Sequence, residues 1–376
     1  MCQAMKNEGQ PFGGINMIFA GDFAQLPPVT GNPLFGDIVA SVIHTTGSHK
    51  KQEAALGKAI WHQFTTVVIL RQNMRQCSQT SKDAAFRQVL ENMRYADCTL
   101  EDIQVLNSMV VGNSQNQVQL TDANFRNISI ITRYNSHRDK INELGCERFA
   151  RGSGHKLYTF YSADKWKSRE NQDKSTRGKQ YAKDKLRSSN IIHPDMQDII
   201  WNLPHCRTEH FPGKLSLCLG MPVMIKNNEA TECGVTNGAE GIVMGWKTRP
   251  LSDDRDALDI VFVKLTVAPK PIQLDGLPEN VVPIVHHIQD IQCKMPNDKT
   301  ITISRDQVSL LPNFAMTDFN SQGRTRPFNV CDLQNCGSHQ SMYTCLSRGS
   351  TFDGTLIVQG FDSQKLMKGV SGYLRQ

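Results

Sequence analysis

The sequence predicts an α/β fold in which a parallel sheet is combined with a small β-barrel. An apolar run of strand length, residues 15–20, ends at the pair Gly21-Asp22. A strand that ends this way places polar side chains at the carboxyl edge of a parallel sheet, where open α/β sheets bind their ligands. Residues 242–312 instead hold short β-prone segments separated by proline and turn residues, a pattern typical of a barrel of about five strands. The same apolar run would also suit a buried strand with a plain proline turn.

Length and composition restrict the class of protein. A chain of 376 residues is long enough for two domains. No apolar run approaches the roughly 18 residues of a membrane span, and the N-terminal residues lack the basic end and apolar centre of a signal peptide. We therefore expect a soluble protein without an export signal.

The cysteines indicate a reducing compartment. All 11 are spread along the chain without a CxxC pair, so free thiols of a nuclear or cytosolic protein are expected, with the mitochondrion as an alternative location. Cys331, Cys336, His339 and Cys345 are all zinc-ligand types, but their spacing matches no common zinc finger. We predict no metal site from them.

The positive charge is concentrated in one segment. The chain carries a net charge of +6, and residues 151–187 hold eleven Lys and Arg against four Asp and Glu, which is a local +7. Aromatic residues lie among these charges, as expected of a track that neutralises phosphates and stacks on bases. The same composition equally suits a solvated, partly disordered loop. The aromatic residues concerned are Tyr158, Phe160, Tyr161, Trp166 and Tyr181.

The remaining elements follow in chain order. Residues 32–63 predict a loop and then a helix, with an apolar stripe formed by Ala54, Ala55, Ala59, Ile60 and Trp61. Residues 65–70 predict a β-branched strand, and residues 82–110 predict two core helices, the second capped by Thr99 and Asp102.

Further along the chain, the strand-and-helix pattern returns twice. Residues 127–145 predict a strand that turns into a helix. Residues 213–245 predict two strands around a polar turn, and residues 314–361 return to α/β character.

The string PFGGINMIFAGDFAQLPPV at residues 11–29 closely resembles motif III of the petite-integration-frequency family of superfamily 1 DNA helicases, which includes the helicase half of Helitron transposon proteins. The resemblance implies a P-loop NTPase (RecA-like) fold. It assigns to Gln25 the role of sensing the terminal phosphate of ATP and coupling it to bound DNA, with Gly21 and Asp22 beside the nucleotide.

Two arginines occupy the positions of later motifs in this family. The segment after residues 65–70 resembles motif IV, so Arg75 is expected to reach the nucleotide; by itself it would suit the start of a helix equally well. The string MYTCLSRGSTFDGTLIVQGF resembles motif VI and places Arg348 at the arginine-finger position. A guanidinium there offers a planar set of donors to the γ-phosphate as negative charge builds up.

Three further segments resemble DNA-contacting parts of the family. The resemblance implies that Thr132 and Asn135 face single-stranded DNA. Residues 236–241 resemble a turn whose backbone after Gly238 approaches DNA or nucleotide closely, which Asn237, Gly238 and Gly241 would permit. A plain β-hairpin would use the same residues. The SQGxT string implies a grip on the DNA backbone. Its expected contacts are Thr317, Ser321, Gln322, Gly323 and Thr325, with Asn320 standing where many members have lysine.

The motifs that hold ATP and Mg²⁺ are not found in the sequence. Its three Gly-Lys pairs, at Gly57, Gly178 and Gly213, lack a following Ser or Thr, and the chain contains no Asp-Glu dipeptide. The resemblance implies ATP and Mg²⁺ as cofactors, but the phosphate loop and the acid pair of the family precede PFGG. We therefore expect the C-terminal part of a helicase, with little or no ATPase activity of its own.

The family resemblance also implies how the chain divides. The predicted parts are a remnant of the first RecA-like lobe at residues 1–35, a linker at 36–63, a second lobe at 64–215 and 314–376 with a basic insertion at 151–200, and an inserted small β-barrel at 216–313.

The function implied is ATP-dependent 5′-to-3′ DNA unwinding in DNA repair, recombination, telomere maintenance or transposon replication, with single-stranded DNA or a single-strand/duplex junction as partner. A non-catalytic single-strand-binding protein derived from a helicase is the alternative from another class. An RNA-remodelling enzyme is a third hypothesis, because a backbone grip does not recognise the sugar.

Overall fold

The computed structural model describes residues 9–30, 33–35, 49–114, 118–167, 190–252 and 254–370. The chain forms two compact units. The first unit comprises Met1–Asn107, Gly337–Ser347 and Asp362–Gln376, and the second comprises Ser108–Cys336 and Arg348–Phe361. The finer division expected from the sequence, with boundaries near residues 35, 63, 215 and 313, stays a prediction.

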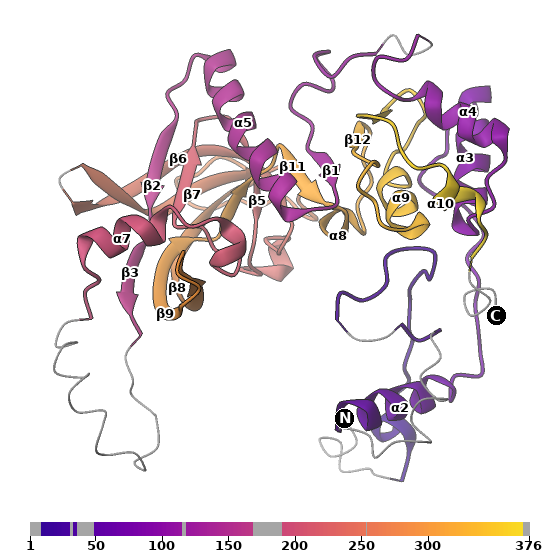
Figure 1. The fold of residues 1–376 in the computed structure, drawn as a ribbon, viewed down its shortest axis with the longest axis horizontal. Coiled ribbons are helices and arrows are strands. Elements are labelled where there is room, and N and C mark those ends of the chain that lie inside the picture. The colour runs from indigo at the N-terminus through magenta and orange to yellow at the C-terminus, as the bar shows by residue number, and fades with distance from the viewer. Residues whose placement is uncertain are drawn as a thin grey trace. The chain divides into compact units, whose positions relative to one another are not determined.

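The first unit is helical in its described residues (Figure 1). Its main helices bury apolar faces, with Phe86 and Met93 of α3 and Leu346 of α9 fully enclosed. The predicted cap before α4 is confirmed, because the Thr99 amide donates to the Asp102 carboxylate at 2.8 Å and the Asp102 amide donates to Thr99 Oγ1 at 3.2 Å. The elements are η1 (Pro11–Gly14), α2 (His49–Trp61), α3 (Ser81–Arg94), α4 (Leu100–Ser108), α9 (His339–Leu346) and α10 (Gln364–Met367).

The strands predicted at residues 15–20 and 65–70 are wrong. Neither segment pairs with another described segment, and their apolar side chains are open to solvent, with Ile18 92% and Leu70 91% exposed. A strand needs a neighbour that takes up its backbone N–H and C=O groups. The described residues of the first unit offer these two segments no sheet to join.

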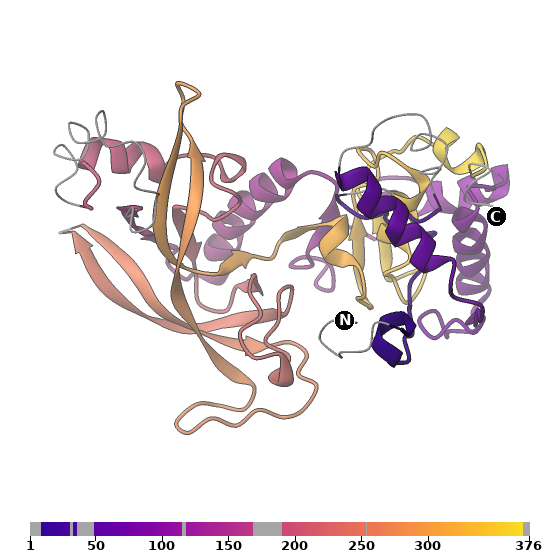
Figure 2. The same cartoon turned by 90° about the horizontal axis from the view of Figure 1, so that it is seen from below.

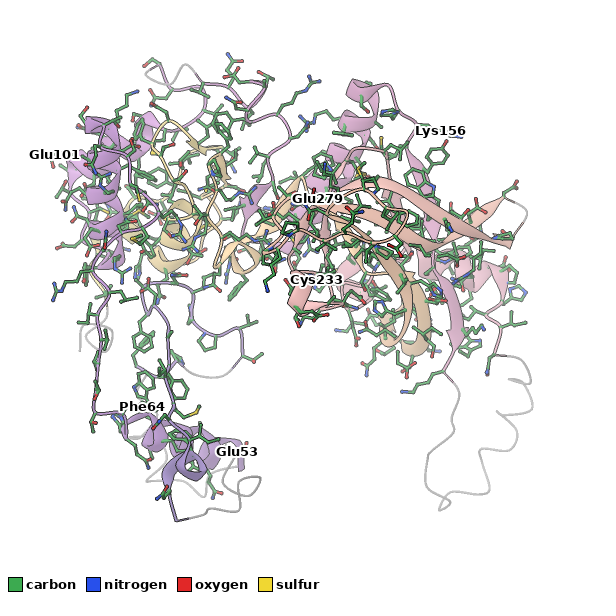
Figure 3. The ribbon with its side chains drawn as sticks, turned by 180° about the vertical axis from the view of Figure 1, so that it is seen from behind. Glu53, Phe64, Glu101, Lys156, Cys233 and Glu279 are labelled. Carbon is green, nitrogen blue, oxygen red and sulfur yellow. The ribbon has the colours of Figure 1, made fainter. Side chains whose placement is uncertain are left out.

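Aromatic side chains, rather than strand pairing, hold residues 19–23 against the end of α2. Phe19 packs edge-on against Phe64 with ring centroids 4.6 Å apart, and its ring lies 6.1 Å from that of Trp61. Phe23 also reaches Trp61 at 6.0 Å. Trp61 ends α2, and Phe64 lies on the chain that leaves it (Figure 3). Of the predicted apolar stripe of α2, Trp61 takes part in this ring packing, and none of the five stripe residues is fully buried.

The second unit contains the predicted parallel sheet, in the order β11-β1-β12-β13. Thr132 at the end of β1 lies directly beside Thr317 at the end of β11. Helix α5 packs along these two strands (Figure 1), and its buried Asn142 accepts hydrogen bonds from the Phe314 and Ala315 amides at 2.9 and 2.8 Å. The strands are β1 (Ile130–Thr132), β11 (Ala315–Thr317), β12 (Asn329–Cys331) and β13 (Thr355–Ile357), and the helices are α5 (Asn135–Ser153), α7 (Pro194–Trp201), α8 (Asp318–Ser321) and the short η3 (His205–Arg207) and η4 (Thr231–Cys233).

The region predicted as a small β-barrel forms an antiparallel sheet of seven strands, in the order β10-β5-β6-β7-β8-β9-β3. It has more strands than expected because β3 and β5 come from sequence before residue 242. Figure 2 shows the strong twist of its β8–β9 hairpin, drawn in orange. The strands are β3 (Ala163–Trp166), β5 (Pro222–Ile225), β6 (Glu240–Ser252), β7 (Arg255–Leu265), β8 (Val281–Lys294), β9 (Thr300–Val308) and β10 (Leu310–Pro312), and a separate pair is β2 (Tyr158–Tyr161) with β4 (Lys214–Leu217).

Only the first part of the basic segment lies in the described residues. There Phe160 is 3% exposed and packs in the core, so its ring cannot stack on a base. Tyr158 is exposed, with the Lys156 ammonium 5.0 Å from its ring centroid (Figure 3 labels Lys156). Residues 168–189, with Tyr181, lie outside the described residues, so the choice between loop and track stays open there.

The ten cysteines in the described ranges carry free thiols. Within those ranges no group of three or more His, Cys, Asp or Glu side chains is arranged to hold a metal ion. Likewise, no described helix combines the length and the apolar character that a membrane crossing requires.

Candidate functional site

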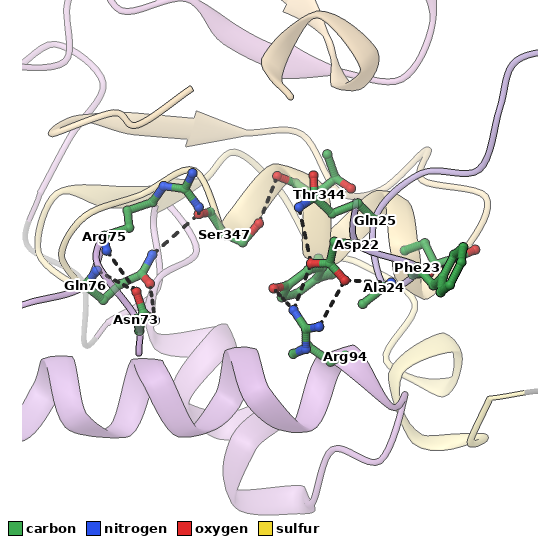
Figure 4. A network of polar contacts seen from close by, with 12 residues as sticks. Asp22, Phe23, Ala24, Gln25, Asn73, Arg75, Gln76, Arg94, Thr344 and Ser347 are labelled. Carbon is green, nitrogen blue, oxygen red and sulfur yellow. Dashed lines mark hydrogen bonds and ion pairs between the residues drawn. The ribbon is translucent and has the colours of Figure 1, made fainter. Parts of the chain in front are cut away.

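The predicted phosphate-sensing loop is held by one carboxylate. Asp22 Oδ1 accepts from the Ala24 amide at 3.0 Å, and the Gln25 side-chain amide donates to Asp22 Oδ2 at 3.2 Å. Arg94 of α3 binds both carboxylate oxygens, at 2.8 and 3.0 Å, and donates to the Tyr343 hydroxyl at 2.7 Å (Figure 4). Arg94, which lies 72 positions after Asp22 along the chain, thus orients Gln25 through the Asp22 carboxylate.

Arg94 favours the ionised form of Asp22 and binds both oxygens of its carboxylate. Burial acts to raise its pKa, but the hydrogen bonds and the charge of Arg94 outweigh it, and the pKa lies below its ordinary value. The pKa of Arg94 is raised in turn. A carboxylate bound at both oxygens by a guanidinium is not available to Mg²⁺. Asp22 therefore does not fit as a magnesium ligand in this structure, and the side chains of Gln25 and Arg75 carry N–H donors, the type of group that binds phosphate.

Arg75 is positioned by a local turn and a distant carbonyl. The Asn73 side chain accepts from the Arg75 amide at 2.9 Å, which closes the turn. The Arg75 guanidinium donates to the Ser347 carbonyl at 2.7 Å, and the buried Gln76 amide points to the same oxygen at 3.5 Å (Figure 4). Burial lowers the pKa of Arg75. The residue is half-buried.

Helix α9 supports both of these predicted site residues. Gln340 donates to the Phe23 carbonyl at 2.9 Å, Tyr343 bonds Arg94, and Ser347 follows the helix end and bonds Arg75. The roles of Gln340, Tyr343 and Arg94 were not predicted. Arg94 lies in a segment that was predicted as a core helix, and Tyr343 lies in the string that was interpreted only through Arg348.

Arg348, the expected arginine finger, belongs to the second unit and is 1% exposed. Its carbonyl accepts from the Arg326 amide at 2.9 Å. Gln25 and Arg75 belong to the first unit, where Gly21 has open space around it. The expected convergence of the two arginines with Gln25 on one nucleotide stays a prediction.

The residues predicted to contact DNA gather at one edge of the parallel sheet. Thr132 and Thr317 end neighbouring strands and lie opposite each other. The Thr132 hydroxyl is buried without a hydrogen-bond partner among the described residues, while Thr317 caps α8 by accepting from the Asn320 amide. Parallel strands that end together direct the following helix N-termini to the same edge, which favours anions.

The SQGxT turn that follows separates into structural and accessible residues. The Ser321 hydroxyl is buried and donates to the Asp318 carbonyl at 2.7 Å, so it serves the fold. Gln322 is half-exposed, and Gly323 and Thr325 are exposed. Gly323 adopts φ +76°, a conformation that L side chains rarely take. The accessible part of the turn is therefore Gln322 to Thr325.

Arg324 joins this turn to the second predicted DNA-contacting loop. Its Nε donates to the Asn320 carbonyl at 2.7 Å, and its two terminal nitrogens donate to the Glu240 carboxylate and the Gly238 carbonyl in close hydrogen bonds. Gly238 adopts φ +95°, and a Cβ there would lie 2.8 Å from Arg324 Nη2. Asn237 is exposed on the same loop. Sequence patterns did not predict this role of Arg324, because two of its partners, Glu240 and Gly238, lie 84 and 86 positions away along the chain.

Gly241 has a different role from its neighbours. A Cβ on Gly241 would lie 2.4 Å from Val263 Cγ1, so this glycine permits the close pairing of β6 with β7. Its role is thus the one that a plain β-hairpin would predict.

Comparisons with known proteins agree on one family. A family model described as PIF1-like helicase matches residues 1–104. The human ATP-dependent DNA helicase PIF1 is 25% identical over 366 residues, which cover 96% of this chain and 43% of that protein. The chain thus spans less than half the length of this curated relative.

Solved structures share the fold. The crystal structure of Pif1 helicase from Candida albicans matches with a TM-score of 0.59 at 18% identity, over all of this chain and 73% of that one. Pif1 from Bacteroides bound to single-stranded DNA also gives a TM-score of 0.59 at 18% identity, over 99% of this chain and 67% of that one. This chain is therefore similar to PIF1-like helicases in sequence over residues 1–104 and to solved Pif1 helicases in fold over nearly its whole length.

Proposed function

We propose that this chain is the strand-gripping and nucleotide-responding part of an ATP-dependent DNA helicase that moves 5′ to 3′ on single-stranded DNA. The observation that carries the proposal is the polar edge of the parallel sheet in the second unit. Asn135 and the turn from Gln322 to Thr325 follow the neighbouring strand ends at Thr132 and Thr317 there. Exposed amides, hydroxyls and main-chain N–H groups can hold a phosphate backbone without selecting a base sequence.

Arg324 fixes the loop at Gly238 next to the turn at residues 322–325. Because it bonds Glu240 and Gly238 as well as the Asn320 carbonyl, Arg324 connects the loop with Asn237 to the turn. A strand bound at this edge would meet two segments that are already joined. Such preorganisation reduces the ordering cost of binding.

Gln25, Arg75 and Arg348 are proposed to act on the nucleotide. The Gln25 amide is oriented by Asp22, and the Arg75 fork is held at the Ser347 carbonyl. Both offer N–H donors suited to phosphate oxygens. A phosphate-loop lysine and the carboxylates that hold Mg²⁺ would have to come from elsewhere, either from another segment or from a partner protein. Gly238 is proposed to serve both the strand and the nucleotide.

For this chain alone we propose strand binding without turnover. The lack of a Gly-Lys-Ser/Thr loop and the full engagement of Asp22 by Arg94 favour this outcome. The same two observations favour the alternative function, a non-catalytic single-strand-binding protein derived from a helicase. The free thiols support a reducing compartment, for which we propose the nucleus, with the mitochondrion as the alternative.

Two assays on the full chain test the proposal. Fluorescence anisotropy with a labelled oligo-dT measures strand binding, and Gln322→Ala together with Thr325→Ala should weaken it about tenfold, the loss expected for two hydrogen bonds. Thr300→Ala, on an exposed threonine of β9, serves as the matched control. Absence of binding by the unmodified chain overturns the strand-gripping role.

A DNA-stimulated ATPase assay addresses the nucleotide. We expect no turnover above the buffer rate. Turnover that Arg348→Ala abolishes would overturn the proposal that the site needs residues from elsewhere. Equal affinity for oligo-dT and oligo-rU would favour the RNA-remodelling hypothesis over a DNA-selective motor.

A further inference from the structure

We propose that a cationic cluster beside the sheet edge is a subsite for one backbone phosphate of the bound strand. The cluster consists of Asn135, Arg138, His205, His210 and Lys226, which come from α5, η3, the loop after η3 and the residue that follows β5. Only Asn135 has a role suggested by sequence. The inference rests on the proposed strand binding and extends its path beyond the SQGxT turn.

The geometry brings four separate segments together around α5. The Asn135 side-chain amide lies 3.5 Å from His210 Nε2. Arg138 is 4% exposed and donates to Asp139 Oδ1 through two nitrogens, at 2.8 and 2.6 Å. His205 Nδ1 lies 3.3 Å from the other oxygen of Asp139. The Asp139 carboxylate is therefore fully used within the cluster.

Lys226 is the observation that points most directly to an anion. Its ammonium makes no hydrogen bond or ion pair with any residue that the structure describes, although the side chain is half-buried. Burial lowers the pKa of Lys226, and the nearby charge of Arg138 lowers it further, against a smaller opposite effect of Asp139. A desolvated cation beside a second cation is unfavourable unless an anion joins them.

The charge count supports the same ligand. Arg138 and Lys226 oppose the single carboxylate of Asp139, so the cluster is positive even when both histidines are neutral. The N-cap residue of α5, Tyr134, provides no side-chain hydrogen bond to the helix, so the positive end of this 19-residue helix adds to the field. A phosphate monoanion matches these donors and this charge.

Hydrogen bonds from Arg305 and to His205 hold the loop that carries His210. Glu209 and His210 both adopt positive φ, 51° and 61°. Phe211 is buried, and its carbonyl accepts from the buried Arg305 at 2.7 Å, while the His210 amide donates to the His205 carbonyl at 2.8 Å. His210 therefore stays exposed at a fixed place beside Asn135 rather than collapsing onto the protein.

The continuity with Thr132 identifies the source of the phosphate. Asn135 begins α5, only three residues after the strand end that forms the proposed grip. A strand leaving that edge would place its next phosphate at the cluster. A free nucleotide would have no such path, so we assign the subsite to the strand.

Binding at this subsite should depend on pH. Without ligand, burial lowers the pKa of His210, with Arg138, His205 and Lys226 adding to the effect and Asp139 opposing it. A bound phosphate stabilises the imidazolium and raises that pKa. Affinity for the strand therefore increases as the pH falls from 8 to 6, and His210→Gln removes part of this increase.

The salt dependence of oligo-dT binding by the full chain provides the test. Lys226→Gln should lower the slope of log affinity against log salt by about 0.7, the value for one phosphate contact on a single strand. Lys226→Arg should retain the slope, and Lys294→Gln, on an exposed lysine of β8, should not change it. Thermal melting of each variant verifies that it is folded.

NMR of ¹³C-histidine-labelled protein separates this inference from the proposed function. Inorganic phosphate should raise the pKa of His210 relative to chloride at equal ionic strength, and oligo-dT should shift the same resonance more than ADP does. If the unmodified chain binds oligo-dT, unchanged slopes together with an unmoved His210 overturn the subsite and leave the function standing. If it does not bind oligo-dT, the proposed function fails, whatever phosphate does to His210. A larger shift with ADP overturns the assignment to the strand.

Discussion

The ion pair of Asp22 with Arg94 makes the stability of the first unit depend on pH. Its pKa is lowered in the folded protein, so the Arg94 pair contributes stability that is fully present above the unfolded pKa of about 3.9. That contribution is lost as the pH falls through the lower, folded value. Asp22→Asn should therefore cost about 1 kcal/mol at pH 7 and should flatten the acid dependence of unfolding.

The measurement can be confined to the first unit. Trp61 is its one tryptophan in the sequence, and it packs against Phe23, the neighbour of Asp22. The 5-fluorotryptophan signal of Trp61 can follow unfolding from pH 7 to pH 2. The matched control is Asp362→Asn, since the Asp362–Lys365 pair is longer, at 3.7 Å, and lies in the same unit. An equal effect of the two substitutions would contradict the special role of Asp22.

Gly238 combines two constraints that a pair of substitutions can separate. Its φ of +95° disfavours any side chain, and a Cβ would also meet Arg324 Nη2 at 2.8 Å. Gly276 has a similar φ of +76° but nothing within 4 Å of its Cβ position. Both alanine substitutions should cost about 1 kcal/mol of backbone strain, and Gly238→Ala should additionally weaken oligo-dT binding by displacing Arg324. Equal oligo-dT affinities in the two variants would show that the Arg324 contacts do not shape the grip.

The Asn142 side-chain amide links helix α5 to the start of β11 by hydrogen bonds. Asn142 accepts from the Phe314 and Ala315 amides and donates to the Ala315 carbonyl at 3.3 Å. Asn142→Leu keeps the volume but leaves these buried groups unpaired, which should cost about 2–4 kcal/mol. Hydrogen exchange at the Ala315 amide is the direct measurement. Lys140→Ala, on an exposed position of the same helix, should leave that exchange rate unchanged.

Sequence patterns predicted some elements well and others wrongly, for one physical reason. The capped helix at Thr99 and the strand-to-helix segment at residues 127–145 depend on neighbours within a few positions, and the structure confirms both. The segments at residues 15–20 and 65–70 have equally good β composition. They form no strand with described residues because strand formation depends on a pairing partner that composition does not reveal.

The exposure of the cysteines in the two units predicts the order in which their thiols react. Cys77 and Cys206 are exposed, whereas burial is the main cause that raises the pKa of Cys146 to about 12 and that of Cys293 to about 11. Iodoacetamide at pH 8, followed by peptide mass spectrometry, should label the two exposed thiols first. Early labelling of Cys146 or Cys293 would contradict the packing of the second unit.

The local chemistry of the chain was decided by sequence alone: the α/β class, the helix caps, and the glutamine and arginines of recognisable strings. These features depend on residue type and short spacing. The supports of the site were decided only by tertiary structure. Arg94 meets Asp22 across 72 positions, Arg324 meets Gly238 across 86, and Asn142 meets Ala315 across 173. Such contacts form only when a folded core brings distant segments together, because no local pattern encodes which polar side chain will face which.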